Sequence, residues 1–229
     1  MNIPVTIHQA RLGQAEFKVI RPARPPARAV LVDRDRFLNL SLDRHAARLT
    51  AGLWSMAASS PRSLIHLPIR TNTDPEADPL DPGARRLDLV LLHHSLRFPP
   101  SRWKELRARL GPGRRQTVAP PAPASFTEAG AGELRVRHHA ENRDLFHQHL
   151  HADTLFMTGS AKLFRETARH FFDIALYGPG HVARSGGYAH YCTEFHSLDG
   201  ILGNAREVHI EYRGRWDPQE PEKQAWNDR

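Results

Sequence analysis

Histidine side chains recur at alternate positions in one short stretch of the chain, a spacing that can build a metal site. The stretch "HHAENRDLFHQHLHADTLFMTG", residues 138–159, contains His147, His149 and His151, and Asp153 continues the alternation. If the stretch forms one strand, successive side chains point to opposite faces, so these four side chains share a face. Two imidazoles at positions i and i+2 can then ligate one transition-metal ion, together with a third ligand from a neighbouring strand.

Two later segments alternate in the same way and would complete such a site. "GYAHYCTEF" places His190, Cys192 and Glu194 on one face, and "REVHIEYR" places His209 on one face with its charged neighbours. If the three strands share a sheet, its open face carries His, Glu and Cys side chains next to one another. The candidate ligands for zinc or a similar ion are His147, His149, His151, His190, Glu194 and His209.

A polar sheet face without a metal explains the same residues. We favour this interpretation and expect no cofactor, because HExxH, paired CxxC and Cys/His finger spacings are absent and a single cysteine cannot build a thiolate site. Phe146, Leu150 and Phe156 fall on the opposite face of the same predicted strand, where they can enter the core.

A second cluster of chemically active side chains is basic. The segment "RFPPSRWKELRARLGPGRR", residues 97–115, holds six arginines and one lysine against a single acid, Glu105. Such a segment can bind phosphates or an acidic protein surface. The alternative is a surface helix docked by Trp103 with a solvated charged face. The candidate residues for binding a partner or nucleic acid are Arg102, Lys104, Arg107, Arg109, Arg114 and Arg115.

Recognisable catalytic signatures are missing from the sequence. It contains no GxxxxGK[ST] phosphate loop, no GxGxxG fingerprint and no GxSxG nucleophile elbow. Cys192 has histidines only on its own predicted strand face, which does not supply a separate base and orienting group. We therefore name no catalytic residues, and we favour a non-enzymatic protein while leaving enzymatic activity open.

The composition limits the class of protein. The 229 residues include 40% hydrophobic and 25% charged residues with a formal net charge of +7, and the isoelectric point is about 10.1. The chain shows neither an apolar run of membrane-spanning length nor a signal peptide, and its single cysteine suits a reducing compartment. We expect a cytoplasmic protein with no membrane association. Its positive charge can attract nucleic acid or an acidic protein, although a GC-rich genome would also enrich arginine.

The order of elements predicts an α+β protein of two small lobes, each a mostly antiparallel sheet with one helix packed on one face. Hydropathic alternation in the strands favours antiparallel sheets with one solvated side. The lobes span residues 1–112 and 131–216, separated by a Pro/Ala-rich linker at 113–130 and followed by a polar tail at 217–229. Both lobes follow the order strand, helix, strand, loop, strand, which suggests a divergent internal duplication.

The second lobe also resembles a known family. A strand ending in "FMTGS" leads into the helix "AKLFRETARHFFDIA", followed by the strand "GYAHYCTEF" and by "HSLDGILGNAREVHIEY". Residues 153–213 are in this respect similar to small bacterial immunity proteins associated with polymorphic toxins. The resemblance implies a binding protein whose partner is another protein, such as an antagonist of a toxin or effector. The alternatives are a nucleic-acid-binding accessory protein using residues 97–115 and a histidine-rich metalloprotein. Oligomeric state is left open.

Overall fold

The computed structural model describes residues 2–73, 84–120, 135–139, 141–184 and 190–216. Three helices are α1 (Arg44–Ser59), α2 (Trp103–Ala108) and α4 (Ala161–Arg184), and short 3-10 turns cover His94–Leu96, Pro100–Arg102 and Ser197–Asp199. The strands are β1 (Ile3–Leu12), β2 (Ala15–Pro22), β3 (Ala29–Asp33), β4 (Leu38–Leu42), β5 (Ser63–Leu67), β6 (Arg85–His93), β7 (Arg114–Val118), β8 (His147–Leu150), β9 (Thr154–Gly159), β10 (Cys192–Phe195) and β11 (Val208–Tyr212).

All of these strands belong to one mixed sheet, which confirms the α+β class. The strand order is β10-β11-β4-β3-β6-β5-β2-β1-β7, and β9 pairs with both β6 and β8. Most pairs are antiparallel, whereas β4–β11, β6–β9 and β2–β5 are parallel. None of the helices in the described residues is both long enough and apolar enough to cross a membrane.

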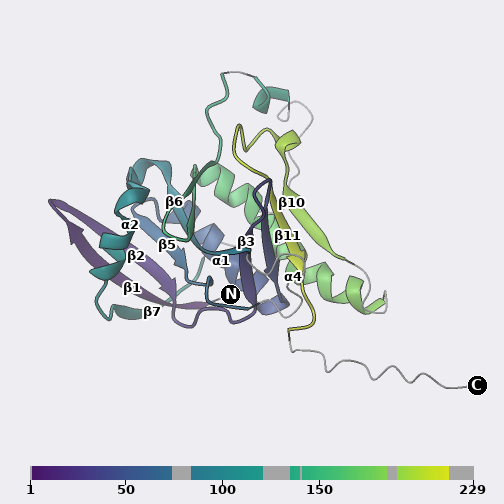
Figure 1. Ribbon diagram of the computed structural model, residues 1–229, viewed down its shortest axis with the longest axis horizontal. Helices are drawn as coiled ribbons and strands as arrows, with labels where there is room; N and C mark the ends of the chain where they lie inside the picture. The colour runs from purple at the N-terminus through teal and green to yellow at the C-terminus, as the bar shows by residue number, and fades with distance from the viewer. Residues whose placement is uncertain (1, 74–83, 121–134, 140, 185–189, 217–229) are drawn as a thin grey trace, which may run out of the picture.

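The two halves of the chain share this sheet instead of forming one sheet each, which differs from the predicted arrangement of lobes. Strand β11 pairs along β4, β9 pairs along β6, and helices α1 and α4 pack against each other (Figure 1). Trp54 of α1 contacts Phe164 and Phe171 of α4, with ring centroids 5.5 and 4.8 Å apart. Helix α1 is buried over most of its circumference. A helix of that kind needs neighbours on several sides, and one small sheet cannot supply them.

The pairing of strands nevertheless repeats between the halves. Each half is a hairpin, a helix and a second hairpin: β3–β4, α1 and β5–β6, then β8–β9, α4 and β10–β11. In both parallel pairs, the second strand of one half lies beside the fourth strand of the other half. Strand β4 pairs with β11, and β9 pairs with β6. In the first half β3 pairs with β6. In the second, the Gln148 side chain of β8 holds the backbone of Arg206, just before β11, through hydrogen bonds of 2.7 and 3.0 Å. This is the pairing expected of a duplicated unit, and the duplication itself stays a prediction.

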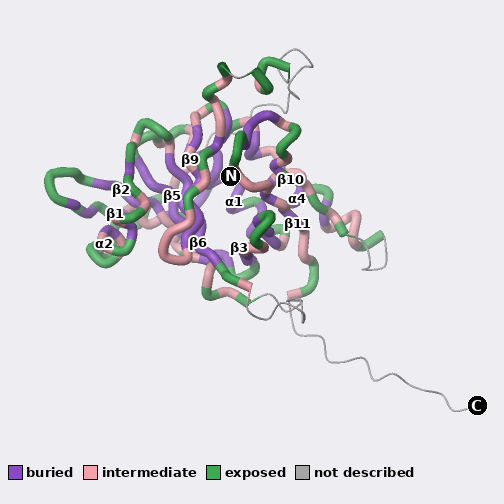
Figure 2. The backbone as a smooth tube through the Cα atoms, turned by 45° about the horizontal axis from the view of Figure 1, so that its top comes forward, coloured by how far each residue is buried: buried purple, intermediate pink, exposed green. Residues whose placement is uncertain are grey.

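Apolar side chains on the two faces of the sheet form two cores. The larger core lies between the sheet and helices α1 and α4, and contains alternate residues of β4, β6, β9 and β11. The smaller core lies on the other face, where Trp103 and Leu106 of α2 cover Val90, Leu92 and Phe156. Figure 2 shows the buried residues concentrated around β5, β6 and α1, while the far end of the β1–β2 hairpin is exposed. These two cores determine which polar side chains are left uncovered.

Two predicted segments have a different structure. The predicted linker at 113–130 includes strand β7, which pairs antiparallel with β1 from Ile3↔Val118 to Ile7↔Arg114. Its side chains are exposed or half-buried, so backbone pairing holds it in place and apolar periodicity could not indicate it. The alternating segment "ELRVRHH" is typical of a strand, but its described residues 135–137 form a helical turn. The remainder of the linker, from 121, and the tail at 217–229 lie outside the described residues.

Candidate functional site

The histidine run does not form the single strand that its alternation predicts. Strands β8 and β9 form a tight hairpin, and Ala152 and Asp153 adopt positive φ angles of 52° and 53° at its turn. His149 lies opposite Phe156 in the antiparallel register. Because the chain reverses at the turn, alternate residues cannot be counted across it. The predicted alternation placed Phe156 on the face opposite the histidines, whereas the hairpin places it opposite His149 on the neighbouring strand.

The histidines of the hairpin lie apart from the other predicted ligands. His147 and His149 are exposed, and His151 is half-buried beside the turn. Strand β8 pairs with β9, whereas β10 pairs with β11, so the histidine strand does not neighbour the other two predicted strands. Among the described residues, the one group of donors close enough for a metal ion contains none of His147, His149 and His151. The predicted ligand set therefore divides into two.

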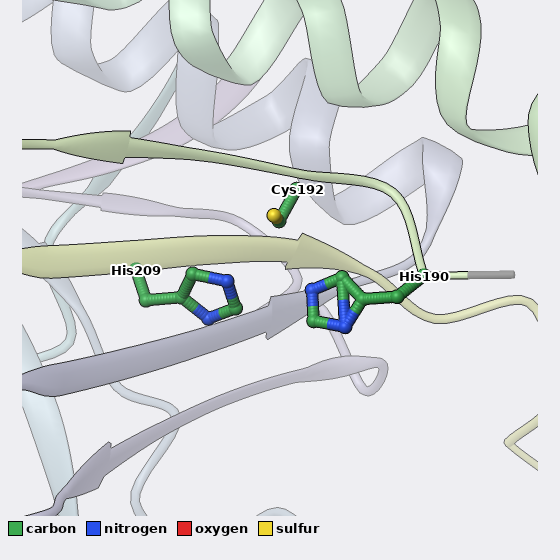
Figure 3. A group of neighbouring side chains, drawn as sticks. All are labelled: His190, Cys192 and His209. Carbon is green, nitrogen blue, oxygen red and sulfur yellow. The ribbon is translucent and has the colours of Figure 1, made fainter.

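Two members of that set, His190 and His209, do come together beside β10 and β11, with Cys192, which was not among the predicted ligands, whereas Glu194 lies outside the group. His190, Cys192 and His209 offer ligand atoms that all lie within 4.8 Å of one another (Figure 3). The antiparallel register places Cys192 opposite Glu211 and Glu194 opposite His209. The alternation of these two strands was thus interpreted correctly, and it brings imidazole, thiol and carboxylate groups onto one face.

A buried carboxylate anchors this face. Glu211 is 5% exposed, and its Oε1 accepts hydrogen bonds from Asn39 Nδ2 at 2.9 Å, Ser41 Oγ at 2.5 Å and the Arg213 guanidinium at 3.0 Å. These donors stabilise the charged form, so the pKa of Glu211 is lowered although burial opposes this. Its other oxygen, Oε2, lies 3.8 Å from His190 Nε2.

The protonation states on this face follow from the same contacts. Burial is the largest cause of the lowered pKa of His209, which makes its imidazole neutral at neutral pH. Burial, followed by the nearby carboxylates Glu194 and Glu211, raises the pKa of the Cys192 thiol. The face thus presents a neutral imidazole and a protonated thiol beside carboxylates.

Three of the six predicted basic residues are paired with carboxylates. Glu105 binds Arg102 at 2.7 Å and Arg109 at 2.8 Å on α2, and Arg107 lies 3.6 Å from the buried Asp88. The other three predicted residues, Lys104, Arg114 and Arg115, are exposed. The basic face of α2 is therefore weaker than its composition indicates.

Arg115 instead belongs to a basic cleft that the sequence did not predict. The cleft has a volume of about 920 Å³ and is bounded by the start of β1, the end of β2, the first turns of α1 and strand β7. Ile3, Val5, Pro22 and Leu49 supply apolar walls. The lining residues include no carboxylate, and their basic members are Arg24, His45, Arg48 and Arg115. Within the described residues no ion pair involves Arg24, Arg48 or Arg115.

A third polar cluster lies inside the protein, between β2, β5 and β6. His66 is 1% exposed, and its Nδ1 accepts a hydrogen bond of 2.9 Å from Arg21 Nε. Its Nε2 therefore carries the proton, 3.5 Å from Asp88 Oδ2. Asp88 also accepts a hydrogen bond from the backbone of Arg70 at 3.0 Å. The cluster is closed by the ring of Trp103, 4.9 Å from the His66 ring, which identifies it as a structural connection between the sheet and α2.

Several of these residues belong to no distinguishing pattern in the sequence. Asn39 and Ser41 lie in the segment "LNLSL", whose leucines indicate a strand but do not single out its two polar residues. Arg24 lies among prolines, and His45 and Arg48 lie on the exposed side of α1. Strand pairing is what brings each of them to a site.

The fold and these clusters define an α+β protein with a polar face on β10 and β11 and a basic cleft beside β7. No family model, curated protein or solved structure matches the chain.

Proposed function

We propose that the protein is a non-enzymatic binding protein whose basic cleft holds an acidic segment of another protein. The observation that carries this proposal is the composition of the cleft. Arg24, His45, Arg48 and Arg115 surround apolar walls, and no carboxylate is present among the lining residues. A charged rim around an apolar floor fits a segment that alternates carboxylates with apolar side chains, because both surfaces are then complementary.

Strand β7 offers a second element of recognition. Within the described residues it pairs only with β1, so one of its edges presents unpaired backbone groups beside the cleft. An extended peptide can add a strand to such an edge, with the backbone supplying affinity and the side chains supplying specificity. Arg114 and Arg115 on this strand would repel basic segments and accept acidic ones.

From the resemblance to immunity proteins, we propose that the biological role of this binding is to antagonise a toxin or effector. We place it in the cytoplasm, where the exposed thiol of Cys192 would remain reduced. Nucleic acid is the competing polyanion, but the pairing of Arg102, Arg107 and Arg109 with carboxylates leaves α2 a weaker phosphate-binding surface.

The experiment measures binding of a labelled peptide of alternating Glu and Leu, and of a single-stranded oligonucleotide of equal charge, to the full-length chain. The variant Arg48→Glu/Arg115→Glu should weaken peptide binding about 5- to 30-fold, because two exposed ion pairs are replaced by repulsion. Arg62→Glu/Lys104→Glu is the matched control, since it makes the same change of charge at exposed positions outside the cleft and away from β7. This control should retain the affinity of the wild type.

Two outcomes would contradict the proposal. Equal weakening by both double variants would show that only net charge matters and that the cleft has no role. Tighter binding of the oligonucleotide, with affinity falling steeply as salt rises, would favour the nucleic-acid alternative. The proposed role as an antagonist is tested separately, by co-expressing the protein with neighbouring genes whose products are toxic. Protection by the wild type that is lost in Arg48→Glu/Arg115→Glu supports it.

A further inference from the structure

A set of metal-binding side chains lies where β10 and β11 meet β4. His190, Cys192 and His209 are close together on the open face. Figure 3 shows the two imidazole rings next to each other, with the sulfur of Cys192 beside them. The ring centroids of His190 and His209 are 5.1 Å apart. His190 and Cys192 are exposed and His209 is half-buried, so an ion could reach the group from solvent.

The orientation of His209 is the first argument for a metal site. Asn39 donates through Nδ2 to Glu211 Oε1, so its amide oxygen faces His209 Nδ1 at 2.7 Å. Nδ1 must then carry the proton, and Nε2 keeps its lone pair. Figure 3 shows the second ring nitrogen of His209 directed toward Cys192 and His190. Histidine ligands of metals usually have this arrangement, with the non-ligating nitrogen donating to a carbonyl or carboxylate oxygen.

The buried charge of Glu211 is the second argument. Asn39, Ser41 and Arg213 engage only its Oε1, which leaves Oε2 next to His190. A carboxylate this deeply buried stabilises a cation on the same face. Glu194, opposite His209 in the register, adds a second negative charge nearby.

We infer that His190, Cys192 and His209 bind one divalent transition-metal ion, with zinc expected and with Glu211, which lies outside the group of three but 3.8 Å from His190, adding negative charge beside it. Imidazole nitrogen and thiolate sulfur are donors that zinc prefers over the hard cations. In a tetrahedral zinc site the donor atoms lie roughly 3.3–3.8 Å apart, so the exposed side chains of His190 and Cys192 must move inward by about an ångström. Binding replaces the thiol proton of Cys192, which is released to solvent, by a sulfur–metal bond.

The experiment uses the full chain purified without a polyhistidine tag, stripped with a chelator and titrated with zinc in a calorimeter. We expect one zinc ion per chain. Cys192→Ser and His209→Gln should each weaken the affinity by at least about tenfold, the lower bound for losing even a supporting group. His149→Gln removes an exposed histidine outside the group and is the matched control, with unchanged affinity expected.

Cobalt and alkylation supply readouts that distinguish a thiolate site from other zinc binding. Cobalt(II) should give a thiolate-to-metal charge-transfer band in the wild type that is absent from Cys192→Ser. Because the chain contains one cysteine, alkylation by iodoacetamide reports on Cys192 alone. Zinc should slow it in the wild type, and chelator should restore it. This second readout needs no variant and remains valid if a substitution unfolds the protein.

Three results would overturn the inference. They are binding of less than one zinc ion per chain, unchanged affinity in Cys192→Ser, and alkylation that zinc does not slow. Loss of zinc binding in His149→Gln would place the metal on the β8–β9 hairpin instead. The cleft variants of the proposed function leave all ligands of this group intact, so failure of either proposal is distinguishable from failure of the other.

Discussion

Acidification should destabilise the protein through the buried histidine His66. The hydrogen bond from Arg21 Nε to His66 Nδ1 requires that this nitrogen be unprotonated. Protonating the ring would place one N–H group against another and bury a positive charge beside Arg21 and Arg107. Burial is accordingly the largest cause of the lowered pKa of His66, from 6.5 to about 4, while the carboxylate of Asp88 opposes it.

The sign and size of the effect follow from this difference between folded and unfolded chains. The unfolded state, with a pKa of about 6.5, binds a proton more readily than the folded state, with a pKa of about 4. Stability therefore falls as the pH is lowered from about 6.5 to about 4 and does not change further below that through this group. At 1.36 kcal/mol per pKa unit, the full effect is about 3 kcal/mol, of which about 2 kcal/mol appears between pH 7 and 4.5.

The assay is chemical denaturation of the wild type and His66→Gln at several pH values between 7 and 4.5. Glutamine can still accept a hydrogen bond from Arg21 but cannot be protonated in this range. The wild type should lose about 2 kcal/mol more free energy of unfolding than the variant over this interval. His170, whose pKa burial lowers to about 3, contributes equally to both proteins and cancels in the comparison. His149→Gln, which changes an exposed histidine, should behave like the wild type.

Parallel pH curves for the wild type and His66→Gln would refute the reasoning, because they would mean that His66 has the same affinity for protons in the folded and unfolded states. A smaller loss in the wild type than in the variant would reverse the sign. That result would show that Asp88 stabilises a charged imidazole more strongly than burial and the arginines destabilise it.

Three further predictions concern the fold. Asp43 caps α1 by accepting a hydrogen bond of 2.7 Å from the backbone of Ala46, so Asp43→Ala should lower the free energy of unfolding by about 1 kcal/mol and Asp43→Asn by much less, measured by urea denaturation. Phe171 is fully buried against Trp54, so Phe171→Ala should cost about 3–5 kcal/mol. Because both halves share this core, tryptophan fluorescence and far-UV circular dichroism should report one coincident unfolding transition, and two separate transitions would contradict a shared core.

The parts of the fold with regular apolar periodicity could be predicted from the sequence. The spacing of Leu49, Leu53 and Met56 is that of a helix and matches α1, and the alternation of β10 and β11 places His190, Cys192 and His209 on a common face. Both predictions depend on local repetition, which a sequence expresses directly.

The neighbours of those elements could not be predicted, because pairing is a non-local property. The turn between β8 and β9 uses Ala152 and Asp153 at positive φ, where a glycine or asparagine would have signalled a hairpin. Strand β7 has no buried face, so only its backbone partner β1 defines it. The pairing of Arg107 with Asp88 joins residues from different elements, and composition alone made Arg107 look available to a partner.

The position of the polar face follows from a difference between the two halves of the fold. The parallel pairs β4–β11 and β9–β6 are equivalent in the repeated unit, and each places apolar side chains toward α1 and α4. On the opposite face, the β6–β9 pair carries Val90 and Phe156, which α2 covers with Trp103.

No helix of the described chain is the counterpart of α2 over β4 and β11. That surface carries Asn39, His209 and Glu211, and it is held together by hydrogen bonds instead of apolar contacts. Polar side chains are favoured on a sheet face that no helix covers, and there they are accessible to an ion or partner. Helix α2 belongs to the first half alone and covers the β6–β9 pair. This difference accounts for why the candidate metal-binding side chains lie beside the β4–β11 pair.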